Sequence, residues 1–220
     1  MKYRETRDGY LYHIFKQLPA VGKYDMPVVR ATQNYQILNM LPFNYINSCP
    51  APNEFYLCFY IDDYQFERIW NNPDKTVELL KQFKGIIGPD FSLYRDMPNM
   101  LNIYNCWRNK VLMAYFQSKG IEVIPNVTWS DESSYDWCFD GLPQDSVVAV
   151  STNGIMRDKR ACELFLSGFK EMTKRLRPTK IIVVGALPEE LKKTPNIINF
   201  IGYSGLFGVE DKNLTYRGDT

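Results

Sequence analysis

The sequence predicts an α/β fold built from repeated strand–helix units. From residue 56 onward, apolar segments of strand length alternate with longer segments of helical period. The expected strands begin roughly 20–35 residues apart, which is typical of βα units. The chain is 45% hydrophobic, which is ample for a packed core. Two architectures fit this pattern: a partial or reduced (βα) barrel and an open, mainly parallel sheet. A complete eight-stranded barrel usually needs about 250 residues.

Local signals place each element of this pattern. Asp62 and Asp63 follow the first strand and can cap the next helix, which we expect to break near the Asn-Asn-Pro-Asp segment. Gly120 and Pro178 are suitable ends for the second and third long helices. The strands are expected at 56–61, 85–93, 121–129, 146–151, 180–186 and 197–203, and the helices at 64–84, 99–120, 159–176 and 188–194.

The chain divides by composition into three parts. Residues 1–55 lack the strand–helix rhythm and are expected to form an N-terminal extension that packs on the domain. Residues 56–207 are expected to form the α/β domain. Residues 208–220 are polar and are expected to form a tail.

Composition also limits the partners. Lys and Arg number 26 against 25 Asp and Glu, so the net charge of +1 gives no indication of nucleic-acid binding. No apolar run approaches the roughly 20 residues that span a bilayer, and no secretory signal is evident, so we expect a cytoplasmic protein without membrane contact. The five cysteines are scattered without CxxC spacing, and His13 is the single histidine. Zinc sites and a Ser-His-Asp triad are therefore disfavoured, and a metal, if used, is expected to be Mg²⁺ or Mn²⁺.

Ligands of both candidate architectures bind at the carboxyl ends of the strands. Polar residues follow several expected strands there, and the neighbouring loop and helix add others. The expected catalytic residues are Asp90, Asp62 and Asp140. The expected substrate-binding residues are Asn126, Trp129, Arg108, Asn105, Ser151 and Asn153. Structural interpretations stay open for some: Asp62 as a helix cap, Trp129 as packing, Arg108 as a salt-bridged surface residue, and the aromatic loop carrying Asp140 as a hydrophobic plug.

An ordered set of motifs runs through the expected domain. The segments are GPDFSLYRDMP, N-x-x-R in the following helix, GIEVIPNVTW, CFDGLP and STNG. Over residues 54–186 this set resembles an uncharacterised domain family associated with bacteriophages, plasmids and integrative elements. The resemblance implies a prokaryotic or phage protein of the host cytoplasm. It matches the family's motif positions at Asp90, Asn105, Arg108, Asn126, Trp129, Asp140 and Asn153. It implies no particular substrate.

Three functions compete at this stage. The first is a hydrolase or phosphodiesterase-type enzyme acting on a nucleotide- or sugar-like small molecule, with carboxylates as acid and base or as ligands of Mg²⁺ or Mn²⁺. The second is a non-catalytic protein that sequesters a small ligand or blocks a host protein. The third is nucleic-acid processing in replication or transfer. Two close carboxylates in a cleft would favour catalysis, whereas arginine with aromatic residues would favour binding.

Overall fold

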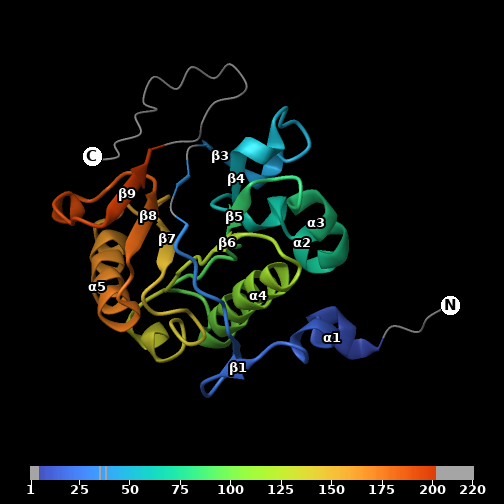
Figure 1. Ribbon diagram of the computed structural model, residues 1–220. Helices are drawn as coiled ribbons and strands as arrows, with labels where there is room; N and C mark the ends of the chain where they lie inside the picture. The colour runs from blue at the N-terminus through green and yellow to red at the C-terminus, as the bar shows by residue number, and fades with distance from the viewer. Residues whose placement is uncertain (1–4, 35, 38, 202–220) are drawn as a thin grey trace.

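The computed structural model describes residues 5–34, 36, 37 and 39–201, so the tail expected at 208–220 lies outside the described residues (Figure 1). The strands are β1 Ala20–Val21, β2 Met26–Pro27, β3 Asn39–Pro42, β4 Phe55–Cys58, β5 Gly85–Ile87, β6 Val123–Ile124, β7 Val147–Ser151, β8 Lys180–Val184 and β9 Ile197–Phe200. The α-helices are α1 Tyr12–Phe15, α2 Arg68–Asn71, α3 Pro73–Leu80, α4 Asn99–Ser118 and α5 Lys159–Leu176. The 3-10 helices are η1 Thr6–Tyr10, η2 Phe43–Tyr45, η3 Pro52–Glu54, η4 Asp63–Gln65, η5 Glu132–Asp136 and η6 Glu189–Leu191.

Strands β3 to β9 are parallel and lie side by side in the order of the sequence. Strands β3–β4–β5–β6 form one sheet and β7–β8–β9 form another. A parallel bridge between Asn126 and Ala149 joins them: the Val127 amide donates to the Ala149 carbonyl, and the Ala149 amide donates to the Pro125 carbonyl, each at 2.9 Å. Within the described residues β9 does not pair with β3, so the arrangement is open. The predicted α/β fold with a mainly parallel open sheet is confirmed.

Side chains on the strands alternate between two hydrophobic clusters. In β8, Ile181 and Val183 belong to the cluster that also contains helix residues, whereas Ile182 and Val184 belong to a second cluster. The second cluster draws its members from the strands and the residues beside them. Strands with two buried faces are typical of parallel sheets covered on both sides. Here one face packs on helices and the other packs on side chains of neighbouring strands, as in the interior of a barrel.

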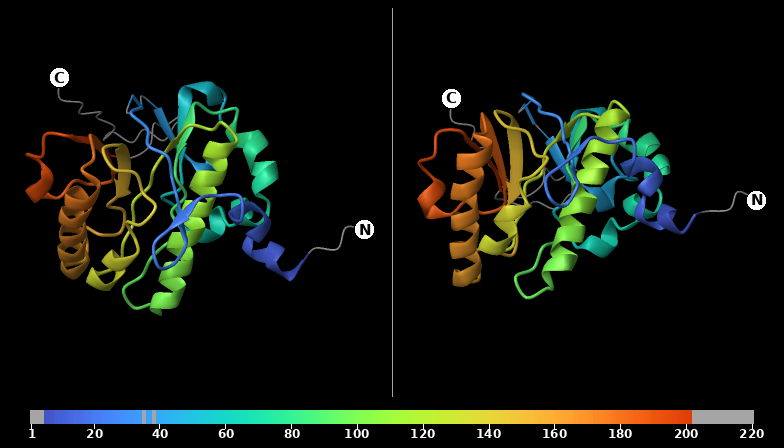
Figure 2. Two further views of the ribbon diagram at one scale, coloured as in Figure 1. Left: turned by 60° about the horizontal axis from the view of Figure 1, so that its bottom comes forward. Right: turned by 90° about the horizontal axis from the view of Figure 1, so that it is seen from below.

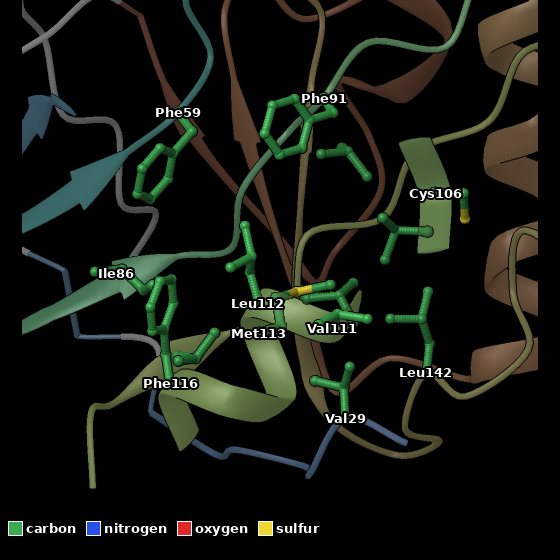
Figure 3. Packing of buried hydrophobic residues seen from close by; sticks show 14 of the residues in the cluster. Val29, Phe59, Ile86, Phe91, Cys106, Val111, Leu112, Met113, Phe116 and Leu142 are labelled. Atoms are coloured by element: carbon green, nitrogen blue, oxygen red, sulfur yellow. The ribbon is translucent and has the colours of Figure 1, made fainter. Parts of the chain in front are cut away.

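The helices cover the outer face of this curved sheet (Figure 1). Leu112 and Phe116 of α4 pack beside Ile86 of β5, and Phe59 and Phe91 lie in the same cluster (Figure 3). The connection that carries η5 lies between α4 and α5 in both further views (Figure 2). The carboxyl ends of the strands are therefore bordered by loops.

Several expected elements are shorter in the structure: the strand expected at 56–61 ends at Cys58, the strand expected at 85–93 ends at Ile87, and the helix expected at 188–194 is the 3-10 helix η6. Two further differences have local reasons. The strand expected at 121–129 is reduced to β6, because Pro125 has no amide hydrogen for the ladder and the chain then turns its pairing from β5 to β7. The helix expected at 64–84 is divided into η4, α2 and α3. Asn72 begins α3, its side chain accepting the Lys75 amide at 3.3 Å, and Pro73 occupies the first helical position.

The N-terminal residues contribute directly to the sheet and lie across it. Strand β3 pairs with β4 as an edge strand. The Thr32 carbonyl accepts the Val147 amide at 2.9 Å, and the Thr32 amide donates to Ser146 Oγ at 3.0 Å. The Gln117 side chain accepts the Arg30 amide at 2.8 Å and donates to the Arg30 carbonyl at 2.9 Å. The division at residue 55 stays a prediction, and these contacts tie both sides of it together.

All five cysteines are free, and their accessibility separates them into two groups. Cys49 and Cys162 are half-buried, whereas Cys58, Cys106 and Cys138 are buried. Burial also raises the pKa of the Cys138 thiol, which disfavours the reactive thiolate.

We expect two thiols to react with Ellman's reagent in the native protein and three to react at least about a hundredfold more slowly, since their reaction needs local unfolding. The Cys49→Ser and Cys162→Ser variants should each lose one fast equivalent. Rapid titration of all five thiols in the folded protein would contradict the buried assignment.

Candidate functional site

A cleft of about 640 Å³ lies at the carboxyl ends of β4, β5, β6 and β7. This is the edge of the sheet at which a ligand was expected to bind. Five of the sequence-predicted residues line it: Asp62, Asp90, Trp129, Ser151 and Asn153. They follow four neighbouring strands, which is why residues far apart in the sequence meet here.

Asp90 is held on the floor of the cleft by Asn126. The Asn126 side-chain amide donates to Asp90 Oδ1 at 2.8 Å and to the Pro89 carbonyl at 3.1 Å. The Tyr60 hydroxyl donates to Asn126 Oδ1 at 2.9 Å. Asn126 is 3% exposed, so its orientation is set by these partners. Asn126 is the single side-chain donor to Asp90 among the described residues, and Asp90 lines the cleft.

Burial changes the acidity of Asp90. Desolvation raises the pKa of its carboxyl from the ordinary value near 3.8 to about 7. The hydrogen bond from Asn126 acts in the opposite direction, and the nearby charge of Asp63 adds to the rise. Asp90 therefore exchanges its proton near neutral pH, as a general acid or base must.

Asp63 is a second carboxylate next to this floor. Its Oδ1 accepts the Ser92 hydroxyl at 2.8 Å, and its Oδ2 accepts the Ser92 amide at 3.1 Å. Asp62 points elsewhere: its exposed side chain lines the cleft. Two successive aspartates therefore take different positions, one fixing the loop after β5 and one facing the cleft.

Helix α4 holds the loop that carries Asp90 through a row of asparagines at helical spacing. Asn109 accepts the Phe91 amide at 2.8 Å and donates to the Phe91 carbonyl at 3.1 Å. Asn102 makes the same pair of bonds with Tyr94, at 3.0 and 2.8 Å. Asn105 donates to the Ser92 carbonyl at 2.8 Å. These side-chain amides thus bond the backbone N–H and C=O groups of the loop, which in a sheet would bond a neighbouring strand.

Arg108 contacts Asn105 of this row and Phe91 of the loop, and it does not line the cleft. Its guanidinium lies 3.6 Å from the ring centroid of Phe91 and donates to Glu67 and Asn105 at 2.8 Å each. The sequence suggested Asn105 and Arg108 as substrate-binding residues. The structure places both beneath the loop, where they position it.

Trp129 borders the cleft as a half-buried residue with fixed neighbours. Its indole N–H donates to the Leu164 carbonyl at 3.3 Å, and its ring stacks on Phe165 with centroids 5.4 Å apart. It also contacts the backbone at Gly168, where a Cβ would collide with the indole. Both the packing role and the substrate-binding role expected for Trp129 are therefore compatible with its position.

An ion pair that sequence reasoning missed joins a lining residue of the cleft to the start of helix α5. Arg95 lines the cleft and its guanidinium lies 2.7 Å from Asp158, the N-cap residue of α5. The Ala161 amide and Arg95 lower the pKa of the Asp158 carboxyl below its ordinary value. Arg95 and Asp96 both line the cleft and belong to the YRDMP part of the motif set, so that motif could have identified them as site residues. The alternation of side chains along the strand that begins at residue 56 could have identified Tyr60 as a residue on the same face as Tyr56 and Cys58.

Asp140 lies apart from these residues. It does not line the cleft; its side chain lies against Gly22 at the β1–β2 turn, where a Cβ would collide with the carboxylate. Its expected catalytic role stays a prediction without support from this geometry. Among the described residues no group of three or more His, Cys, Asp or Glu side chains comes together as a metal site, and the expectation of Mg²⁺ or Mn²⁺ stays a prediction.

Fold and site together define an α/β protein with an open parallel sheet and a polar cleft at its carboxyl edge. The chain belongs to the DUF4417 family, described as a domain of unknown function, whose model matches residues 18–203. The resemblance predicted from the motifs over 54–186 is thus confirmed and extends further on both sides.

Two phage proteins are similar to the chain. It is 35% identical over 182 residues to the Gene 1 protein of Mycobacterium phage L5, which covers 76% of this chain and 80% of that protein. It is 34% identical over 175 residues to the Gene 1 protein of Mycobacterium phage D29, which covers 77% of this chain and 63% of that protein. No solved structure matches the chain. Across the described residues, no helix combines the length and apolar character needed to cross a membrane.

Proposed function

We propose that the cleft is the active site of a hydrolase that acts on a polar small molecule, nucleotide- or sugar-like, in the cytoplasm of the host cell. The observation that carries the proposal is Asp90, a carboxyl with its pKa raised to about 7 and one oxygen fixed by Asn126. A carboxyl kept partly protonated at neutral pH can protonate a leaving group or accept a proton from water.

Neighbouring residues suit the other roles that hydrolysis needs. Asp62 lines the same cleft and is exposed, so it is the candidate for the second carboxylate, which acts on water or on the substrate. Ser151 and Asn153 line the cleft after β7, where the Ser151 hydroxyl donates to the Val184 carbonyl and the Asn153 side-chain amide donates to the Tyr60 carbonyl, each at 3.3 Å, so these bonds fix the shape of the wall. Trp129 and Phe165 offer ring edges and faces to a substrate ring.

Replacing Asp90 by asparagine tests the proposal. Asparagine keeps the shape and the bond with Asn126 but cannot transfer a proton, so we expect a loss in kcat of about a hundredfold or more. The assay uses p-nitrophenyl glycosides, nucleosides and bis-p-nitrophenyl phosphate as probes. Wild-type activity should change with an inflection near pH 7, reflecting Asp90. The matched control is Glu54→Gln, because Glu54 is exposed at the start of β4, at the opposite end of the strand from the cleft. Turnover that survives Asp90→Asn unchanged would refute the role of Asp90.

Exposed apolar residues near the cleft favour a second candidate, a non-catalytic protein that blocks a host protein. Tyr94 borders the cleft and is 54% exposed, and Met100 at the start of α4 is 78% exposed. Aromatic residues and methionine are enriched in recognition surfaces. Under this candidate no probe would be hydrolysed, and Tyr94→Ala would weaken capture of the partner while Asp90→Asn would not.

A further inference from the structure

The orientation of the Asn126 side-chain amide is determined by the groups on its two sides. The Pro89 carbonyl can only accept a hydrogen bond, so the Asn126 side-chain nitrogen, 3.1 Å away, must be the donor. The Asn126 oxygen therefore accepts from the Tyr60 hydroxyl, which lies 2.9 Å from it. The amide nitrogen also donates to Asp90 Oδ1 at 2.8 Å. The direction of every bond from Tyr60 to Asp90 is thereby fixed.

Tyr60 is itself held in place by its surroundings. It follows strand β4, lines the cleft and is 6% exposed. Its backbone carbonyl accepts the Asn153 side-chain amide at 3.3 Å. Asn126 is joined to β7 by its bridge with Ala149. Tyr60 therefore connects the ends of β4, β6 and β7, and neither Tyr60 nor Asn126 can turn without breaking buried hydrogen bonds.

These bonds affect how Asp90 carries its proton. Oδ1 accepts an N–H and is the less basic oxygen of the carboxyl, so the exchangeable proton belongs on Oδ2. The bond from Asn126 favours the charged form and lowers the pKa of Asp90, against the rise that burial causes. A hydrogen bond accepted by the oxygen of an amide strengthens the donation by its nitrogen. The Tyr60 hydroxyl therefore acts on Asp90 through Asn126.

Other ionisable groups surround Asp90, and the charge of Asp63 adds to the rise in its pKa. Among the described residues none of these groups bonds to Asn126 or Asp90, so they do not share the path from Tyr60. They are Asp62 and Asp63 after β4, Arg95 and Asp96 in the loop after β5, Asp158 paired with Arg95, and Arg108 with Glu67 beside Phe91.

We infer that Tyr60 is a positioning residue: its hydroxyl fixes the Asn126 amide, so that Asp90 keeps its proton on Oδ2 and releases it more readily than burial alone would allow. This inference rests on the proposed function, in which Asp90 is the general acid or base. Tyr60 acts through Asn126, whereas Asp90 transfers the proton.

Carbon-13 NMR of protein labelled at the aspartate carboxyls measures the pKa of Asp90, whose signal is identified by its loss in Asp90→Asn. Tyr60→Phe keeps the ring, and we expect it to raise this pKa by about 0.3, which makes the acid about twofold weaker. Asn126→Ala removes the donor and should raise the pKa by about 1, which makes the acid about tenfold weaker.

The matched control is Tyr56→Phe. Tyr56 belongs to the same cluster as Tyr60, is 0% exposed and starts on the same strand. Its hydroxyl accepts the Asn34 side-chain amide, and neither residue lines the cleft. This variant also loses a buried hydroxyl bond, so we expect a loss of stability with a change in the pKa of Asp90 below about 0.1.

Two further readouts separate positioning from a merely structural role. In the Asn126→Ala background, Tyr60→Phe should change the pKa of Asp90 by less than about 0.1, because the path through Asn126 is gone. In the wild type, the side-chain amide signals of Asn126 should shift with the same pKa as the Asp90 carboxyl, a result that needs no substitution. The inflection in turnover should move to higher pH in Tyr60→Phe, while KM changes less than about twofold.

The outcomes separate the two proposals. A folded Tyr60→Phe protein with the Asp90 pKa of the wild type overturns the inference, and so do Asn126 amide signals that stay constant while Asp90 titrates. The proposed function still stands in those cases if Asp90→Asn abolishes turnover. The expected pKa changes without hydrolysis of any probe would support the role of Tyr60 and overturn the hydrolase.

Discussion

Replacing Asp90 by asparagine raises the melting temperature of the protein at pH 8 by about 4–8 °C, and the gain vanishes near pH 4. Folding raises the pKa of this carboxyl from about 3.8 to about 7. The folded protein therefore binds more protons than the unfolded chain between these values, and wild-type stability falls as pH rises through this window. The full shift corresponds to roughly 4 kcal/mol. Because the side chain is partly open to the cleft, we expect about half of it, ~2 kcal/mol.

Differential scanning calorimetry from pH 4 to pH 8 measures this effect. Glu54→Gln removes a carboxylate that is exposed and outside the cleft, and its stability difference should not change with pH in this way. An equal effect of Asp90→Asn at both ends of the range would show that Asp90 is not protonated by folding. A variant that gains stability while losing turnover is the expected signature of a residue kept for function.

Replacing Asn109 by alanine lowers the free energy of unfolding by about 3 kcal/mol, because two buried backbone groups lose their partners. Asn109 is 2% exposed, and its side chain satisfies both the amide and the carbonyl of Phe91, which is 0% exposed. Water cannot replace these bonds without opening the loop. Since Phe91 follows Asp90, we also expect ligand binding at the cleft to weaken.

Urea unfolding measures the loss, and Asn99→Ala is the control on the same helix. Asn99 is exposed, and its side chain makes one long bond, 3.4 Å, to Ser133. We expect the control to change stability by no more than about 0.5 kcal/mol. If both variants unfold alike, the loop does not depend on Asn109. Asn109→Asp should fall between them, since it keeps the acceptor for the Phe91 amide and loses the donor.

Much of the fold could be predicted from the sequence because the strands are short, apolar and regularly spaced. Helix α5 matches its expected range of 159–176, since Asp158 caps its start and Pro178 follows its end. The rule that ligands bind at the carboxyl ends of parallel strands located five of the cleft residues in advance. Asn126 was expected to bind substrate; it is buried and does not line the cleft, and its side chain bonds Asp90 and Tyr60.

The functions of the α4 residues could not be predicted in the same way. A helical pattern shows which residues share a face but not what covers that face. Helix α4 is covered on more than one side, so polar residues such as Lys110 are buried in it, with Nζ 2.9 Å from the Cys138 carbonyl. For the same reason Asn105 and Arg108 were expected to bind substrate, although they bind the loop after β5. The bridge from Arg95 to Asp158 depends on two loops 63 residues apart, which no local pattern reveals.

The segment around Thr32 that crosses the sheet cannot be placed until residues made much later in synthesis are present. Thr32 bonds to Ser146, 114 residues later in the chain. At about 5–20 residues per second, the ribosome takes roughly 6–23 s to make the stretch between them. During that interval Met26 and Val29, which are 0% and 1% exposed in the folded protein, have yet to meet their later partners. We therefore expect this apolar segment to stay exposed on nascent chains until the residues around Ser146 have been made, which would suit it for chaperone binding.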